Sequence, residues 1–103
     1  MVHGDLVYAS GQVDRSATAE TSVAAQTRAI LSQIDLLLAE AGTSKASILS
    51  ATVWLVDIGT WDEMNRIWVE WIEKGAAPAR ATVEARLAGK EYRVEIAVIA
   101  AIE

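Results

Sequence analysis

The chain has 103 residues, enough for one domain with a single hydrophobic core. Nine basic and fourteen acidic residues give a net charge of −5, so nucleic acid is not an expected partner. There is no cysteine and only one histidine, His3, which excludes a thiolate nucleophile and a multi-histidine metal site. No apolar run approaches the ~20 residues that span a bilayer, and no secretory signal is visible, so we expect a cytoplasmic protein without a membrane segment.

The pattern of apolar residues predicts the order strand, helix, strand, helix, strand, strand. Residues 6–10 form a short strand that ends at Gly11. Residues 18–41 repeat apolar side chains at the spacing of one helical face, and Gly42 is expected to end this helix. Residues 49–58, rich in β-branched and aromatic side chains, predict a buried strand.

The second helix is predicted from a capping box. In the sequence TWDE, residues 60–63, a hydroxyl is followed three residues later by a carboxylate. The helix is expected to run to about Lys74 and to end at Gly75, because the following proline cannot continue it. Residues 78–87 and 94–102 predict two strands, and we expect a hairpin turn between them.

Two strand–helix–strand units favour an α/β or a mixed sheet with right-handed crossovers, which can place both helices on one face. In residues 49–58 and 94–102, both sets of alternating side chains are largely apolar. A single layer of two helices cannot cover both faces, and an exposed apolar patch of that size is unusual for a monomer. We therefore expect one domain that forms a homo-oligomer whose sheets pack against each other.

Arg80 and Glu95 are charged residues on two otherwise apolar strands. Taking each such charge out of water costs several kcal/mol, unless the charge is paired or solvated. One interpretation is a pocket in which the guanidinium holds an anion and the carboxylate transfers a proton. The other is a structural ion pair, with Glu84, Glu91 or Glu95 as the partner of Arg80. Spacing alone leaves both open.

Four further residues are candidates for the same pocket. Ser10 and Gly11 end the first strand, where glycine permits a ligand to approach the backbone closely. Thr82 lies on the same strand face as Arg80, and its backbone N–H is a candidate anion donor. Asn65 lies in the second helix, where an exposed structural role is an alternative. The three tryptophans of that helix favour a packing stripe over a platform for stacking bases.

Taken together, several segments resemble the RidA (YjgF) family, in the family's order and over nearly the whole chain. They are YASGQ (8–12), AG (41–42), ATVWLVD (51–57), MN (64–65), PAR (78–80) and VEI (94–96). Residues 92–96 and the Trp68-x-x-Trp71 spacing look most like the YoaB-like branch. The resemblance implies a chorismate-mutase-like α+β fold and a homotrimer whose sheets form a central barrel, with ligand sites in clefts between subunits.

The resemblance also implies an activity. Active members hydrolyse 2-imino acids such as 2-iminobutanoate and 2-iminopropanoate to 2-keto acids and ammonia, without a cofactor. Carried over by motif, Arg80 would bind the substrate carboxylate with help from backbone N–H groups of Gly11 and Thr82. Glu95 would activate the attacking water, and Ser10 and Asn65 would line the cleft.

Two departures from the family pattern bear on this activity. The family has a further strand before residues 6–10 that carries an aromatic residue of the site, and residues 1–4 are too short to supply it. Thr82 stands where a cysteine is frequent, which preserves a backbone contact but not a thiol role. The alternative function is therefore a non-catalytic module of the same fold that binds small carboxylates or regulates a partner.

Overall fold

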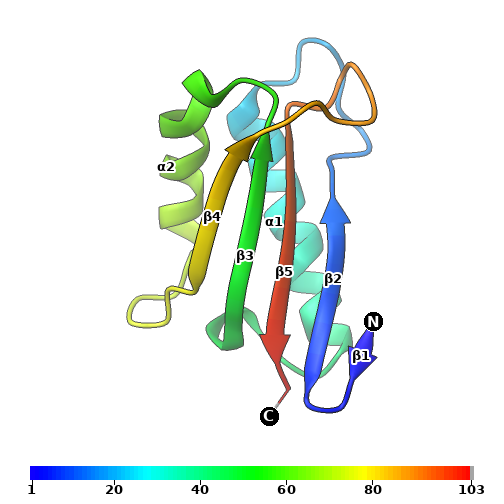
Figure 1. Cartoon of the computed structure of the whole chain (residues 1–103), viewed down its shortest axis with the longest axis vertical. Helices are drawn as coiled ribbons and strands as arrows, with labels where there is room; N and C mark the ends of the chain where they lie inside the picture. Colours follow the sequence, from blue (N-terminus) through cyan, green and yellow to red (C-terminus); the bar gives the residue numbers. More distant parts are fainter. Residues whose placement is uncertain (103) are drawn as a thin grey trace.

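The computed structural model describes residues 1–102, so that Glu103 of the predicted domain lies outside the described residues. Its elements are two helices, two 3-10 turns and five strands: β1 (Val2–His3), β2 (Leu6–Gln12), α1 (Val23–Glu40), η1 (Lys45–Ser47), β3 (Ile48–Leu55), η2 (Ile58–Thr60), α2 (Trp61–Trp71), β4 (Ala79–Glu84) and β5 (Val94–Ala101). Figure 1 shows both helices on the same face of the sheet. The predicted α+β fold with two helices over a mixed sheet is confirmed.

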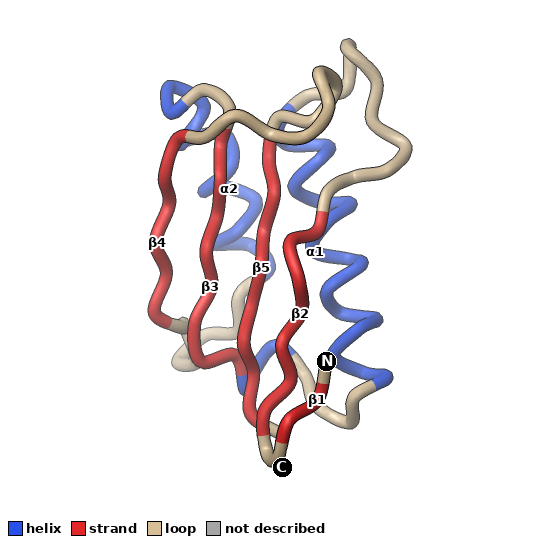
Figure 2. Tube along the Cα trace, turned by 45° about the vertical axis from the view of Figure 1, so that its right-hand side comes forward, coloured by secondary structure: helices blue, strands red, loops and turns tan. Residues whose placement is uncertain are grey.

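The strands lie in the order β1-β2-β5-β3-β4. Among the described strands, only β3 and β4 are parallel. Helix α2 connects them and returns the chain to the end of the sheet at which β3 begins. The last strand, β5, inserts between β2 and β3, as Figure 2 shows, and the arrows of Figure 1 show that it is antiparallel to both. The predicted hairpin between the last two strands is therefore wrong: β3 separates them, and residues 85–93 cross the end of β3.

The core lies between the sheet and the helices. Helix α1 is preceded by the cap Ser22, whose side chain accepts from the N–H of Ala25. It ends at Glu40, and Gly42, just beyond the C-cap Ala41, takes a φ of 85°. Its buried stripe packs on alternate residues of the central strands. The fully or nearly fully buried members include Ile30, Ile34 and Leu38 on α1, Val53 and Leu55 on β3, and Val94, Ile96 and Val98 on β5. Each such side chain stabilises the fold by about 1.5–3 kcal/mol.

The predicted capping box at α2 is wrong. The preceding 3-10 turn η2 gives Thr60 a φ of −91° and a ψ of 10°, and its hydroxyl donates to the carbonyl of Asp57 instead of capping the helix. The carboxylate of Glu63 accepts a hydrogen bond from the N–H of Ala24, 2.9 Å away in the first turn of α1. Glu63 thus caps the neighbouring helix and joins the two helices.

A short strand that was not predicted from the sequence, β1, precedes β2. Val2 and His3 pair with Val7 and Leu6 of β2. The amino group of Met1 also donates to the carbonyl of Tyr8 at 2.8 Å. This strand covers only the first half of the outer edge of β2.

Gln26 is a fully buried polar residue that fixes the approach to β5. Its amide nitrogen donates to the carbonyls of Thr21 and Glu91, at 3.1 and 2.9 Å, and its oxygen accepts from the N–H of Arg93 at 2.9 Å. The N-terminal end of α1 is thereby bound to the loop directly before Glu95. The orientation of β5 at the candidate site depends in part on this amide.

We expect Gln26→Met, which keeps the length but removes the hydrogen bonds, to lower the free energy of unfolding by about 2–4 kcal/mol, because buried backbone groups lose their partners. Urea denaturation measures the change. The control is Gln33→Met on the same helix, where the side chain is not buried. Equal losses from the two substitutions would contradict the structural role given to Gln26.

Candidate functional site

Arg80 lies on the edge strand β4 with its side chain on the helix side of the sheet. It pairs with Ala51, which is buried against the helices. Its Nη1 donates to Oδ1 of Asn65 on α2 at 2.8 Å. The central carbon of the guanidinium lies 5.5 Å from the ring centre of Trp61 and 5.2 Å from that of Trp68. Both distances are within the range of cation–π contacts.

These contacts argue against one of the two interpretations of Arg80, the structural ion pair within a protomer. Within residues 1–102 its partners are an amide oxygen and two indole rings, and none is a carboxylate. Glu84, one of the candidate partners, accepts instead from the N–H of Ile58 at 2.9 Å. Burial lowers the pKa of Arg80, but an arginine remains protonated at neutral pH. The guanidinium is therefore a cation that no acidic side chain within residues 1–102 neutralises.

Thr82 lies two residues further along β4, on the same face as Arg80. It pairs with Val53, which is fully buried on the helix side. The Thr82 hydroxyl is buried and has no hydrogen-bond partner among the described residues. An unsatisfied buried polar group costs about 1–3 kcal/mol, so its position beside Arg80 is consistent with a missing partner there.

Glu95 lies on the opposite face of the sheet, which the helices leave open. It is the second residue of β5 and pairs with Trp54 of β3. A Cβ built on Gly11 would overlap Oε2 of Glu95 and lie 2.9 Å from its Cδ. Only glycine at position 11 lets the carboxylate lie over the β2 backbone, at the irregularity in pairing between Ala9 and Gln12.

A single protomer does not bring Arg80 and Glu95 together. Paired residues share a sheet face, so Arg80 lies with Ala51 beneath the helices and Glu95 lies with Trp54 on the open face. Of the predicted site residues, Asn65 is hydrogen-bonded to Arg80, and Thr82 lies on the same strand face as Arg80. Gly11 lies beside the carboxylate of Glu95. The two groups of residues are separated by the thickness of the sheet.

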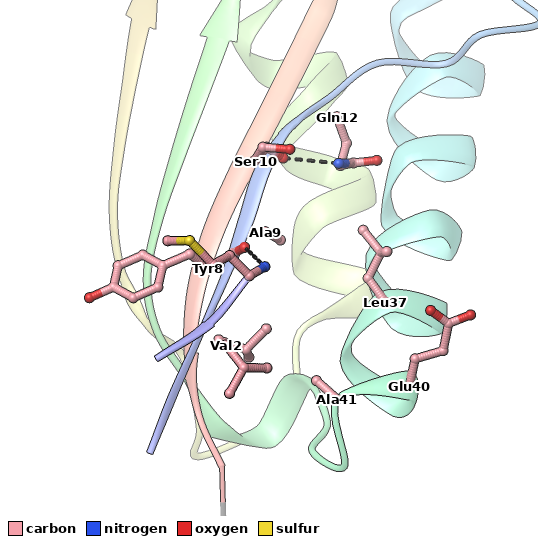
Figure 3. A pocket seen from close by; sticks show the side chains of 10 residues that line it. Val2, Tyr8, Ala9, Ser10, Gln12, Leu37, Glu40 and Ala41 are labelled. Carbon is pink, nitrogen blue, oxygen red and sulfur yellow. Dashed lines mark hydrogen bonds between the residues drawn. The ribbon is translucent and has the colours of Figure 1, made fainter. Parts of the chain in front are cut away.

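Ser10 is exposed beside Gly11 and borders two hollows. One, of about 460 Å³, lies on the open face and is lined by residues including Tyr8, Ser50 and Thr52. The other, of about 340 Å³, lies between the outer edge of β2 and α1. Figure 3 shows this second hollow, with Leu37 and Glu40 reaching from α1 and the Gln12 amide donating to the Ser10 carbonyl.

The described residues contain no group of three His, Asp or Glu side chains placed to hold a metal ion. Over the same residues, neither helix has the length and apolar character needed to cross a membrane.

The two indoles around Arg80 are site residues that the sequence analysis assigned to packing alone. Trp61, Asn65 and Trp68 are spaced by four and three residues, which puts them on one face of α2. Trp68 is indeed buried in the core, but it also contacts the guanidinium. The shared helical face with Asn65 was the signal available in the sequence.

Comparison with known proteins identifies the class to which this fold belongs. The family model described as Endoribonuclease L-PSP matches residues 1–102. A RutC family protein of Haemophilus influenzae is 41% identical over 99 residues, which cover 96% of this chain and 84% of the relative. The RutC family protein YoaB of Escherichia coli is 36% identical over 102 residues, 99% of this chain and 87% of the relative.

Solved structures of YjgF and Rid family members have the same fold as this chain. A YjgF family member from Neisseria meningitidis superposes with a TM-score of 0.91 at 44% identity, covering 96% of this chain and 81% of that one. YyfA of Yersinia pestis, described as a member of the Rid protein family of unknown function, gives a TM-score of 0.90 at 33% identity, covering 98% and 83%. This chain belongs to the RidA/YjgF/RutC family, as its motifs predicted.

Proposed function

We propose that this protein is a deaminase that hydrolyses 2-imino acids to 2-keto acids and ammonia at a site made by two copies of the chain. Arg80 of one copy binds the substrate carboxylate, and Glu95 of another activates water. In a homotrimer the open sheet faces would line a central barrel, and each cleft would join the β4 edge of one subunit to the Glu95 face of the next. The expected setting is the cytoplasm, where pyridoxal-phosphate enzymes release such imines.

The observation that carries the proposal is the state of Arg80. An arginine presents five N–H donors, and among the described residues the one hydrogen bond of this guanidinium is to Asn65. The remaining donors suit two parallel hydrogen bonds to a carboxylate. The outer edge of β4 has no strand partner among the described residues, so a second copy can approach it there.

In this proposal Glu95 acts as a general base. A water molecule attacks the imine carbon, and the carboxylate takes one of its protons. That proton then passes to the nitrogen, which gives a carbinolamine. The carboxylate moves the remaining hydroxyl proton to the nitrogen as the C–N bond breaks, so ammonia leaves and the carbonyl forms. Because imines hydrolyse in water unaided, orientation of the water and stabilisation of charge account for the acceleration.

A second candidate function is a non-catalytic carboxylate-binding module, which the same free guanidinium supports. Ribonuclease activity, named in the description of the family model, fits poorly with a net charge of −5 and a single histidine.

The deaminase is tested by measuring imine decay in a coupled assay in which an amino-acid oxidase or dehydratase generates the imine. Calorimetry with 2-ketobutyrate runs in parallel. Decay at the buffer rate would contradict the deaminase, and binding without turnover would favour the module.

Gly11→Ala tests the position of the Glu95 carboxylate. The new methyl group would displace this flexible side chain without straining the backbone, because Gly11 has no positive φ. We expect turnover to fall about tenfold or more, as for other misplaced catalytic groups, with little change in the melting temperature. Gly59→Ala is the control, since its added Cβ comes no closer than 3.0 Å to its nearest neighbour, Asp57. Unchanged turnover in Gly11→Ala would exclude a role for Glu95 in this position.

A further inference from the structure

Within residues 1–102, the side chains that contact the Arg80 guanidinium share one property: they carry no charge. Asn65 contributes an amide oxygen, and Trp61 and Trp68 contribute the faces of two indole rings. We call these three residues the neutral cage. A carboxylate in the place of Asn65 would hold the guanidinium more strongly, but it would also neutralise the charge that an anion needs.

The cage is braced by the rest of the helical layer. Trp68 is only 5% exposed, and its ring centre lies 5.5 Å from that of Trp71 at an interplanar angle of 53°. Nε1 of Trp71 in turn donates to Oδ2 of Asp35 on α1 at 3.0 Å. The orientation of the guanidinium is thereby tied to both helices and to β4.

We propose that Trp61, Asn65 and Trp68 are positioning residues that fix the direction of the Arg80 guanidinium while leaving its charge for a carboxylate ligand. The inference rests on the proposed role of Arg80 in binding carboxylates. It revises the role expected for Asn65, which holds the arginine instead of lining the cleft. Trp61, at 37% exposure, is the outer member of the cage and faces solvent.

The first test is Asn65→Asp, which exchanges an amide for a carboxylate of the same shape. An ion pair with Arg80 replaces the neutral contact, so affinity for 2-ketobutyrate, measured by calorimetry, falls by about tenfold or more. The melting temperature stays at or above that of the unsubstituted protein, because the new pair is favourable. Gln33→Glu makes the same chemical exchange on α1, away from Arg80, and leaves the affinity unchanged.

The second test concerns Trp61. Trp61→Leu removes the indole face, and we expect an affinity for 2-ketobutyrate weaker by about three- to tenfold, in line with cation–π contacts. Trp61→Phe keeps an aromatic face and recovers part of that loss. A role for Trp61 in packing alone predicts no such difference between phenylalanine and leucine.

Three results would overturn the neutral cage. One is full affinity in Asn65→Asp, another is an affinity loss matched by a lower melting temperature, and the third is no binding of 2-ketobutyrate by the unsubstituted protein. The proposed deaminase activity fails separately. If the unsubstituted protein binds 2-ketobutyrate and Asn65→Asp does not, while neither accelerates imine decay, the cage stands and the deaminase does not.

Discussion

Arg80→Ala is expected to abolish carboxylate binding at the concentrations where the unsubstituted protein is saturated. Removing one partner of a hydrogen-bonded charge pair costs about 2–5 kcal/mol, roughly a 30-fold to 5,000-fold loss of affinity. Turnover falls with it, because the imine is no longer held near the attacking water. Calorimetry with 2-ketobutyrate and the coupled imine assay measure the two effects.

Arg86→Ala is the matched control for this substitution. Arg86 is exposed just beyond the end of β4, so its removal changes the net charge equally without touching the cage. Arg80→Lys adds a second comparison, since lysine keeps the charge but lacks the planar pair of donors, and we expect partial binding. Equal binding by Arg80→Ala and Arg86→Ala would remove Arg80 from the ligand site.

Glu95→Gln is expected to separate turnover from binding. The amide keeps the shape that packs over Gly11 but cannot accept a proton from water. We expect the acceleration of imine decay to fall about 100-fold, a typical share for general base catalysis. Affinity for 2-ketobutyrate stays the same or rises, because a negative charge is removed from the neighbourhood of a carboxylate ligand.

The control variant for Glu95→Gln is Glu91→Gln. It removes an equal charge four residues earlier in the chain, outside β5. Full turnover in Glu95→Gln would mean that Arg80 and bound water suffice without a base. Loss of binding and turnover together would instead mean that Glu95 is needed to build the site.

Sequence patterns predicted the elements better than their arrangement. The apolar periodicity of α1 follows from local packing on one face, and the residues at that spacing include Ile34, which is fully buried. The place of β4 depends on which strand it pairs with, and that is decided by α2 returning the chain to β3. Its pairing of Arg80 with Ala51 has no signal in either segment alone.

For the candidate site too, individual residues were predicted but their arrangement was not. Arg80 and Glu95 stood out because charges on apolar strands need a reason, and Gly11 because a glycine near a strand end permits close approach. Their separation onto two faces appears only once the register of β3 with both β4 and β5 is known. The contacts of Trp61 and Trp68 with Arg80 join a helix to a strand, and local spacing does not reveal such contacts.

The most direct measurement mixes two inactive proteins. Arg80→Ala and Glu95→Gln subunits are unfolded together, refolded as a mixture and assayed for imine hydrolysis. If each site takes its guanidinium from one subunit and its carboxylate from the next, random assembly leaves about a quarter of the sites intact, and activity returns to that level. Refolded mixtures no more active than either variant alone would show that no site is shared between copies of this chain.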